Sequence, residues 1–136
     1  MGKRNTSRKL AMQVLFQTEF QNSPALDTIN HYLNRQSQFD ETKTWTLSLI
    51  EGVLEHKNSL DDLIKKYAVD WEINRMNGVD RNLLRLAFYE MKYLQTPVAV
   101  ILNEVIELAK KYSTDDSPKF INGILGNFVR KECSPE

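Results

Sequence analysis

The spacing of apolar residues between residues 80 and 94 limits the fold of this chain more than any other feature. At about 100° per residue, the apolar side chains surround most of a helix. They are Leu83, Leu84, Leu86, Ala87, Phe88, Met91 and Leu94. The remaining polar stripe is narrow and consists of Arg81, Arg85, Tyr89 and Lys92. A helix of this kind is covered on nearly every side, so it belongs in the centre of a helical bundle.

Helical spacing also prevails in the rest of the chain. No run of strictly alternating residues is long enough to indicate a strand. Helix starts are marked by Ser, Thr, Asp or Asn caps and by proline in the first turn. Such starts are expected at Thr6 or Ser7, Ser23–Pro24, Asp40 to Thr42, Asn58 or Ser59, Asp80, Pro97 and Ser117–Pro118. The sequence therefore predicts an all-α protein of about seven helices.

Basic residues gather at the amino terminus, although the chain as a whole is neutral. It has 18 basic and 18 acidic residues, and its formal net charge is zero. Four cations precede the first acidic residue, Glu19: they are Lys3, Arg4, Arg8 and Lys9. A basic segment on a mildly acidic body can hold a polyanion at one edge of the molecule. A solvated terminus is the simpler alternative, and charge alone leaves it open.

Phe16 is a candidate for base stacking on the first expected helix. The apolar face of this helix is formed by Leu10, Ala11, Val14, Leu15 and Thr18. At about 100° per residue, Phe16 lies almost opposite that face, and Lys9, Arg8 and Gln13 lie around it. Unpaired bases stack on aromatic rings at roughly 1–3 kcal/mol each, so this pattern favours single-stranded nucleic acid. Alternatively, Phe16 packs with Met12 and Phe20 against a second helix.

The helix expected from Ser117 has an unusual polar face. Its apolar face is formed by Phe120, Ile121, Ile124, Leu125 and Phe128. The other side carries Lys119, Asn122, Gly123 and Gly126. A glycine inside a helix costs up to about 1 kcal/mol relative to alanine, so another helix or an RNA backbone is expected to approach closely here. The free N–H groups at Ser117 to Lys119 suit a phosphate, whereas Asp115 and Asp116 suit the amino groups of bases.

No catalytic or metal-binding constellation is evident. His31 and His56 lie on different expected helices without a nucleophile pattern nearby, and Cys133 is the only cysteine. Because phosphate-binding glycine loops and metal-ligand motifs are also missing, we expect a non-enzymatic protein without a cofactor or metal. No stretch approaches the ~20 apolar residues of a membrane span, and no signal peptide is apparent. We therefore expect a cytoplasmic protein.

Several motifs occur along nearly the whole chain: Arg8, Ala11, Gln13, Leu15 and Phe16; Gly52; Val79-Asp80-Arg81, Leu84-Arg85-Leu86-Ala87 and Tyr89-Glu90; Pro97; Asn103-Glu104 with Glu107 to Tyr112; and Ser117 with Lys119 to Leu125. Together they are similar to the motifs of the NusB family of transcription antitermination factors. The two blocks in 103–125 are the most specific. The resemblance implies two packed helical subdomains in one RNA-binding domain, at about residues 1–76 and 77–136.

The resemblance also implies a function. It implies a protein that binds the single-stranded boxA element of nascent RNA together with the ribosomal protein NusE. The pair would join an antitermination complex on RNA polymerase during ribosomal RNA synthesis. With the geometry of the first helix added, the predicted RNA-binding residues are Lys3, Arg4, Arg8, Lys9, Gln13, Phe16, Asp116, Lys119 and Phe120. The predicted partner-binding residues are Asp80, Arg81 and Leu84.

Other interpretations stay open. The polar stripe of residues 80–94 and the glycine face of the last helix would also suit a protein-interaction module without RNA binding. Exposed apolar residues such as Phe16 and Phe20 could instead serve a homodimer that hides the RNA surface. A hydrolase would rest on exposed carboxylates alone. Some ribosomal RNA cytosine methyltransferases carry a similar RNA-binding domain, but the sequence shows no glycine-rich cofactor motif, so methylation is not expected.

Overall fold

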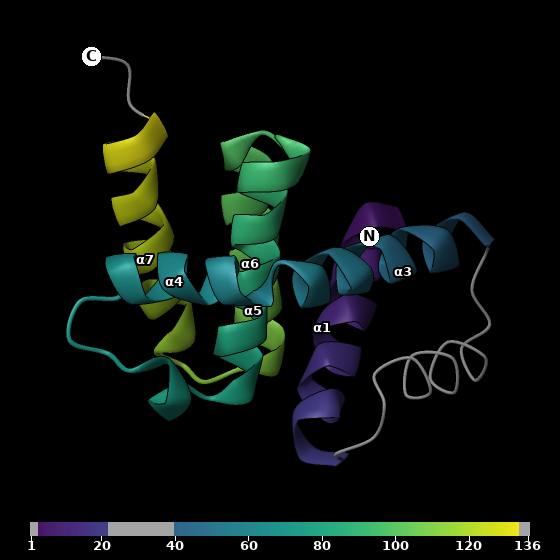
Figure 1. Ribbon diagram of the computed structural model, residues 1–136, viewed down its shortest axis with the longest axis horizontal. Coiled ribbons are helices and arrows are strands. Elements are labelled where there is room, and N and C mark those ends of the chain that lie inside the picture. Colours follow the sequence, from purple (N-terminus) through teal and green to yellow (C-terminus); the bar gives the residue numbers. More distant parts are fainter. Residues whose placement is uncertain (1–2, 22–39, 134–136) are drawn as a thin grey trace. The chain divides into compact units, whose positions relative to one another are not determined.

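A computed structural model describes residues 3–21 and 40–133 (Figure 1). The regular elements in these ranges are all helical, which confirms the predicted all-α class. The α-helices are α1 (Lys3–Gln21), α3 (Asp40–Glu55), α4 (Lys57–Tyr67), α5 (Gly78–Tyr89), α6 (Val98–Tyr112) and α7 (Ser117–Phe128). Shorter helical segments are η1 (Ile73–Arg75), η2 (Glu90–Leu94) and η3 (Val129–Cys133). The helix expected from Ser23–Pro24 lies outside the described residues.

Contacts divide the chain into two compact units, Met1–Glu55 and His56–Glu136. This boundary lies earlier in the chain than the predicted one, near residue 76. The difference concerns α4, which packs against α5 and α7 and so belongs to the second unit. Its buried residues are Leu60, Ile64 and Tyr67. Within the part of the chain that the structure describes, no helix is long and apolar enough to cross a membrane.

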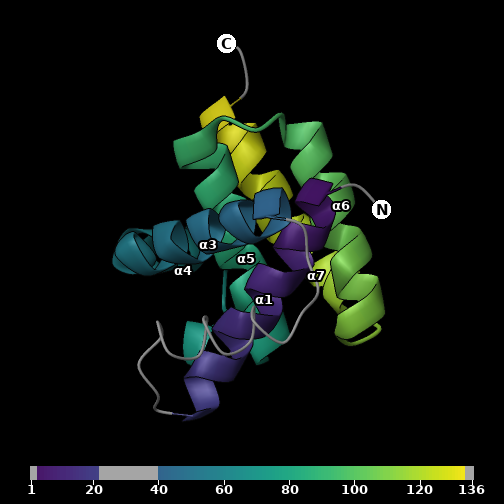
Figure 2. The same cartoon turned by 90° about the vertical axis from the view of Figure 1, so that its right-hand side faces the viewer.

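In the first unit, α1 packs against α3, and Figure 2 shows the two helices crossing at an angle. Buried apolar residues line both helices: Leu10, Ala11, Val14 and Leu15 on α1, and Leu49, Ile50 and Val53 on α3. The Ser7 hydroxyl donates a hydrogen bond to the Thr42 carbonyl oxygen at 3.1 Å. Thr6 or Ser7 is the predicted cap of α1, but the helix already begins at Lys3, and Ser7 instead connects α1 to α3.

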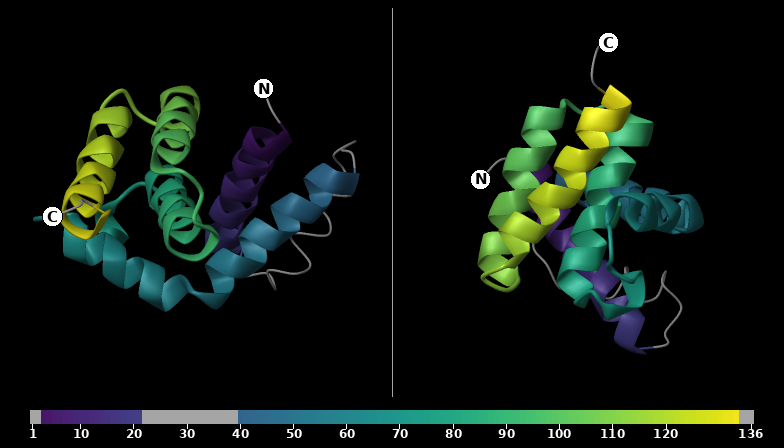
Figure 3. Two further views of the ribbon diagram at one scale, coloured as in Figure 1. Left: turned by 90° about the horizontal axis from the view of Figure 1, so that it is seen from above. Right: turned by 90° about the vertical axis from the view of Figure 1, so that its left-hand side faces the viewer.

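In the second unit, α5 is the central helix. It contacts α4, α6 and α7, while α6 and α7 pack on each other (Figure 3). Most of the apolar residues that define its pattern are buried, as predicted: Leu83, Leu84, Leu86, Ala87 and Phe88. The α-helix ends at Tyr89, and the chain continues as the π-helical segment η2. Leu94, at the end of η2, is 37% exposed.

The cap of α5 lies earlier in the chain than predicted. Asn77 precedes the helix, and its side-chain oxygen accepts a hydrogen bond from the Asp80 backbone N–H at 2.9 Å. The helix therefore begins at Gly78 rather than near Asp80. A side-chain cap of this kind satisfies one of the free donors of the first helical turn. Asn77 and Gly78 thus mark the helix start.

Candidate nucleic-acid interface

The basic segment of α1 is only partly available to a ligand. Arg4 is exposed, and its guanidinium lies 4.4 Å from the centre of the Trp45 ring. Lys9 is half-buried, whereas Arg8 is only 3% exposed. Lys3 belongs to α1, but its side chain lies outside the described residues. The prediction of Arg8 as an open phosphate contact is therefore corrected.

Arg8 is buried because the buried face of α1 extends past its regular apolar residues. The helical wheel assigned one apolar face, but Met12 is 2% exposed and lies one turn after Arg8. Leu15, a further turn along, is also 2% exposed and completes a stripe at i, i+4 and i+7. The buried surface of α1 is thus wider than its most regular apolar face indicated.

The sequence left open whether Phe16 is exposed for base stacking or packed against a second helix, and its burial is intermediate. Its side chain is half-buried, as are those of Gln13 and Lys9. Phe16 and Gln13 both form contacts within the chain, so neither is free in solution. The proposed base-stacking role of Phe16 stays a prediction, with Lys9 and Gln13 rather than Arg8 as accessible neighbours.

The start of α7 brings the carboxyl-terminal predicted residues together. Asp116 and Lys119 are exposed on either side of Ser117, which is 1% exposed. Phe120 is half-buried, and its ring meets the Trp71 ring edge-on, with 5.2 Å between centroids. A hollow of about 340 Å³ lies here. It is lined by Trp71, Arg75, Met76, Asn77, Asp80, Thr114, Asp116, Ser117 and Phe120.

The Asp80 carboxylate is the centre of a hydrogen-bond network that lines this hollow. Its carboxylate accepts hydrogen bonds from the Ser113 hydroxyl at 2.6 Å and from the Ser117 hydroxyl at 2.8 Å. The Asn77 side-chain amide donates a third hydrogen bond, at 3.1 Å. The Asp80 residue is 5% exposed. Its side chain thus connects the start of α5 to the start of α7.

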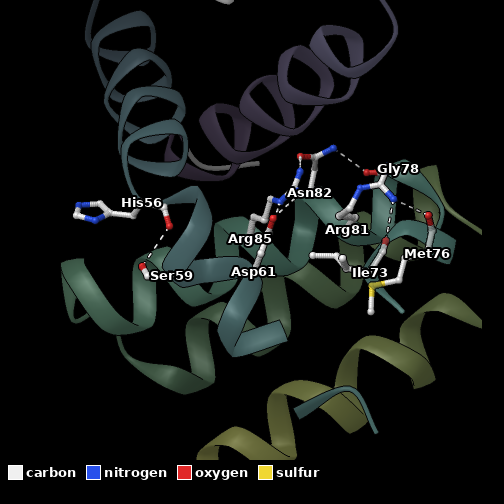
Figure 4. Close-up of polar contacts among 9 residues, drawn as sticks. All are labelled: His56, Ser59, Asp61, Ile73, Met76, Gly78, Arg81, Asn82 and Arg85. Carbon is white, nitrogen blue, oxygen red and sulfur yellow. Dashed lines mark hydrogen bonds and ion pairs between the residues drawn. The ribbon is translucent and has the colours of Figure 1, made fainter. Parts of the chain in front are cut away.

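The other two predicted partner-binding residues also have internal roles. Arg81 donates hydrogen bonds through Nη1 to the carbonyl oxygens of Ile73 at 3.0 Å and Met76 at 2.8 Å (Figure 4). Leu84 is fully buried. A direct partner contact would need exposed side-chain atoms, which Leu84 does not offer and Asp80 scarcely offers. These residues stabilise the second unit from within.

The polar stripe of α5 is also used internally. Arg85 Nε donates to Asp61 Oδ1 at 2.7 Å, and Arg85 Nη2 donates to Asp61 Oδ2 at 3.1 Å (Figure 4). The side chains of Arg85 and Asp61 are only 7% and 18% exposed. This bidentate ion pair joins α5 to α4. The stripe therefore gives less support to a separate interaction surface than the sequence indicated.

Sequence reasoning missed a second hollow, which lies along α7. It has a volume of about 410 Å³, and we call it the α7 groove. Its lining includes Val69, Trp71, Lys119, Phe120, Gly123 and Arg130. Val69 is 67% exposed and Trp71 is 52% exposed. Two large apolar residues around Asp70, directly after an amphipathic helix, were the available sequence signal.

The predicted packing of another helix against the glycines of α7 is not found at Gly123 or Gly126 within the described residues. A Cβ atom built on Gly123 would meet no other atom within 4 Å. A Cβ atom on Gly126 would lie 3.5 Å from Arg130 Nη1, a side chain of the segment that follows α7. Within the described residues, helix packing therefore does not explain Gly123.

A charged cluster joins the end of α4 to the end of η3. Glu132 accepts hydrogen bonds from the Tyr67 hydroxyl and from Lys66 Nζ, the latter at 3.1 Å. The hydrogen bonds from Tyr67 and Lys66 lower the pKa of the Glu132 carboxyl. The hydrogen bond to Glu132 raises the pKa of the Lys66 ammonium group. This carboxylate is consequently charged and paired, which reduces its repulsion of an anion nearby.

Comparison with known proteins identifies the family. The NusB family model matches residues 5–130. The chain is 43% identical to the transcription antitermination protein NusB of Streptomyces avermitilis, covering 99% of this chain and 95% of the relative. It is 34% identical to the solved structure of T. maritima NusB, with a TM-score of 0.87 and coverage of 98% and 94%. A structure of the antitermination factors NusB and NusE with double-stranded RNA shares the fold, with a TM-score of 0.87 at 23% identity over 96% of this chain and 98% of that one. This chain therefore belongs to the NusB family, as the match to its family model and the similarity to transcription antitermination proteins show.

Proposed function

We propose that this protein binds boxA-type single-stranded RNA together with NusE, as a factor that prevents premature termination of ribosomal RNA transcription. Such a factor would act in the cytoplasm, in a complex with RNA polymerase. The observation that carries the proposal is the surface at the start of α7, where exposed Asp116 and Lys119 flank the Phe120 ring. The NusB of the same fold that was solved with NusE and RNA supports the choice of partners.

The chemistry of this surface suits unpaired bases. Lys119 can neutralise a phosphate, and Asp116 can accept hydrogen bonds from base amino groups. The half-buried Phe120 ring lines the hollow at the start of α7, where its exposed part can stack on a base. The related complex contains double-stranded RNA. Stacking on an aromatic ring, however, requires an unpaired base, so we propose single-stranded boxA as the ligand.

The amino-terminal helix would contribute a second, smaller set of contacts. After the correction for Arg8, the proposed residues on α1 are Arg4, Lys9, Gln13 and Phe16. Arg4 is exposed, but its stacking on Trp45 already occupies part of its guanidinium surface. We therefore expect α1 to strengthen binding through charge, and the start of α7 to provide most of the base selectivity.

The test is an RNA-binding titration by fluorescence anisotropy. A labelled boxA RNA and a scrambled RNA are titrated with the protein, with and without NusE. We expect boxA to bind more tightly than the scrambled RNA, NusE to strengthen binding, and affinity to fall with salt. Lys119→Ala should weaken binding and reduce the salt slope by about one, because one phosphate contact is lost. Lys57→Ala, at the exposed first residue of α4, is the matched control.

Two outcomes would count against the proposal. Equal affinity for boxA and scrambled RNA would exclude sequence preference. If NusE bound tightly while neither RNA bound, with or without NusE, the protein would be an interaction module instead. A homodimer that blocks RNA would be recognised by a doubled mass in light scattering. Its apparent RNA affinity would also decrease as the protein concentration rises above the dimer dissociation constant.

A further inference from the structure

We propose that the α7 groove binds a single-stranded RNA segment that continues beyond the contacts at the start of α7. Trp71 would stack on a base, while Lys119 and Arg130 would contact phosphates on either side of Gly123. The inference rests on the proposed RNA-binding function and extends it to residues that the family motifs did not indicate. It concerns the second unit alone, since every lining residue belongs to His56–Glu136.

The first observation is the exposure of the aromatic residue. Trp71 is 52% exposed, and the neighbouring Val69 is 67% exposed. Between them, Asp70 adopts a positive φ of 66°, an uncommon conformation for a residue other than glycine. The backbone N–H of Trp71 donates a hydrogen bond to the Ala68 carbonyl oxygen at 3.2 Å, which closes this turn. The backbone thus presents two large apolar side chains to solvent, and the ring is held edge-on to Phe120.

The second observation is the charge of the lining. It contains two cations, Lys119 and Arg130, and no carboxylate among the described residues. Both cations are exposed, and neither forms an ion pair within the part of the chain that the structure describes. They are about 16 Å apart along the helix axis at 1.5 Å per residue, which is room for more than one nucleotide. The nearby Glu132 carboxylate is already paired with Lys66.

The third observation is the open space above Gly123. This glycine is exposed, lies between Lys119 and Arg130 along α7, and has no atom within 4 Å of a built Cβ. A glycine lowers helix stability, so the missing side chain is expected to serve contact with something outside the unit. A nucleic acid backbone that runs between two cations needs such a flat surface. An acidic peptide would also meet the cations, but an exposed indole ring favours a base.

The experiment compares two labelled RNAs in the presence of NusE: a short boxA RNA and the same RNA with a single-stranded extension at each end. The variants are Trp71→Ala, Gly123→Gln and Arg130→Gln, and Lys111→Gln, at an exposed position of α6 outside the groove, is the control. We expect Trp71→Ala to weaken binding of the extended RNA by roughly fivefold to a hundredfold, the range for one lost stacking contact. Arg130→Gln should reduce the salt slope by about one.

Gly123→Gln separates a binding role from a structural one. Its new side chain meets open space, so the melting temperature should not fall, while binding of the extended RNA should weaken several-fold. A Trp45→Phe background leaves Trp71 as the only tryptophan, because the chain has two. Its fluorescence should be quenched by the extended RNA.

The outcomes distinguish this inference from the proposed function. If wild-type protein binds boxA but all three groove variants bind the extended RNA as the wild type does, the groove inference is wrong and the proposed function stands. If the variants weaken NusE binding and leave RNA affinity unchanged, the groove is a protein site. If the wild type binds neither RNA, both proposals fail.

Discussion

The ion pair between Asp61 and Arg85 should make a large contribution to the stability of the second unit. The Asp61→Ala substitution leaves the Arg85 guanidinium 7% exposed and without its bidentate carboxylate. Removing one partner of a buried ion pair costs about 3–5 kcal/mol. Asp61 is itself 18% exposed, and Arg85 keeps a hydrogen bond to the Asn82 side-chain oxygen at 3.3 Å. We therefore expect a loss near the lower limit, about 3 kcal/mol.

Urea denaturation followed by circular dichroism measures this loss. The exposed neighbour Asp62 provides the matched control, and Asp62→Ala should change the free energy of unfolding by less than about 0.5 kcal/mol. In a double-mutant cycle, Asp61→Leu with Arg85→Met should cost less than Asp61→Ala alone, because no buried charge is left unpaired. If Asp61→Ala costs under about 1 kcal/mol, the pair behaves like a surface ion pair and the reasoning is wrong.

Three further predictions concern the same unit. Gly123→Ala should raise the free energy of unfolding by up to about 1 kcal/mol, because a Cβ atom meets open space; a loss of stability in a urea melt would show an unseen close contact. Asp80→Ala should lower it by about 2 kcal/mol, because two serine hydroxyls lose a charged acceptor; an unchanged melting temperature would contradict this. The lowered pKa of Glu132 stabilises the fold above the ordinary pKa of 4.5, and this contribution is lost as the pH falls through the lower folded-state value. Thermal melts of Glu132→Gln should therefore depend less on pH in acid than those of the wild type, and identical pH profiles would refute the role of Glu132.

Among the proposed functional residues, those at the start of α7 were accessible to sequence reasoning. The positions of Asp116 and Lys119 followed from a cap and proline pattern that marks a helix start within a residue of its true position. The α1 residues were less predictable. The apolar pattern of α1 predicts an exposed Arg8, but Arg8 is buried. A pattern of apolar residues does not indicate whether polar positions beside it are also covered. Trp71 was missed because its exposure depends on a turn after α4 rather than on a periodic pattern.

Local patterns in the sequence were enough for the helical class, most helix starts in the described ranges and the central position of α5. These properties depend on residues within a few turns of one another, through side-chain periodicity and first-turn hydrogen bonds. The fate of the polar residues was decided by contacts between distant parts of the chain. Arg85 is neutralised by Asp61 on another helix, and Asp80 is bonded by Ser117, which lies 37 positions away in sequence. The tertiary structure therefore decides which polar residues are buried, because a buried charge is stable only where a complementary group reaches it.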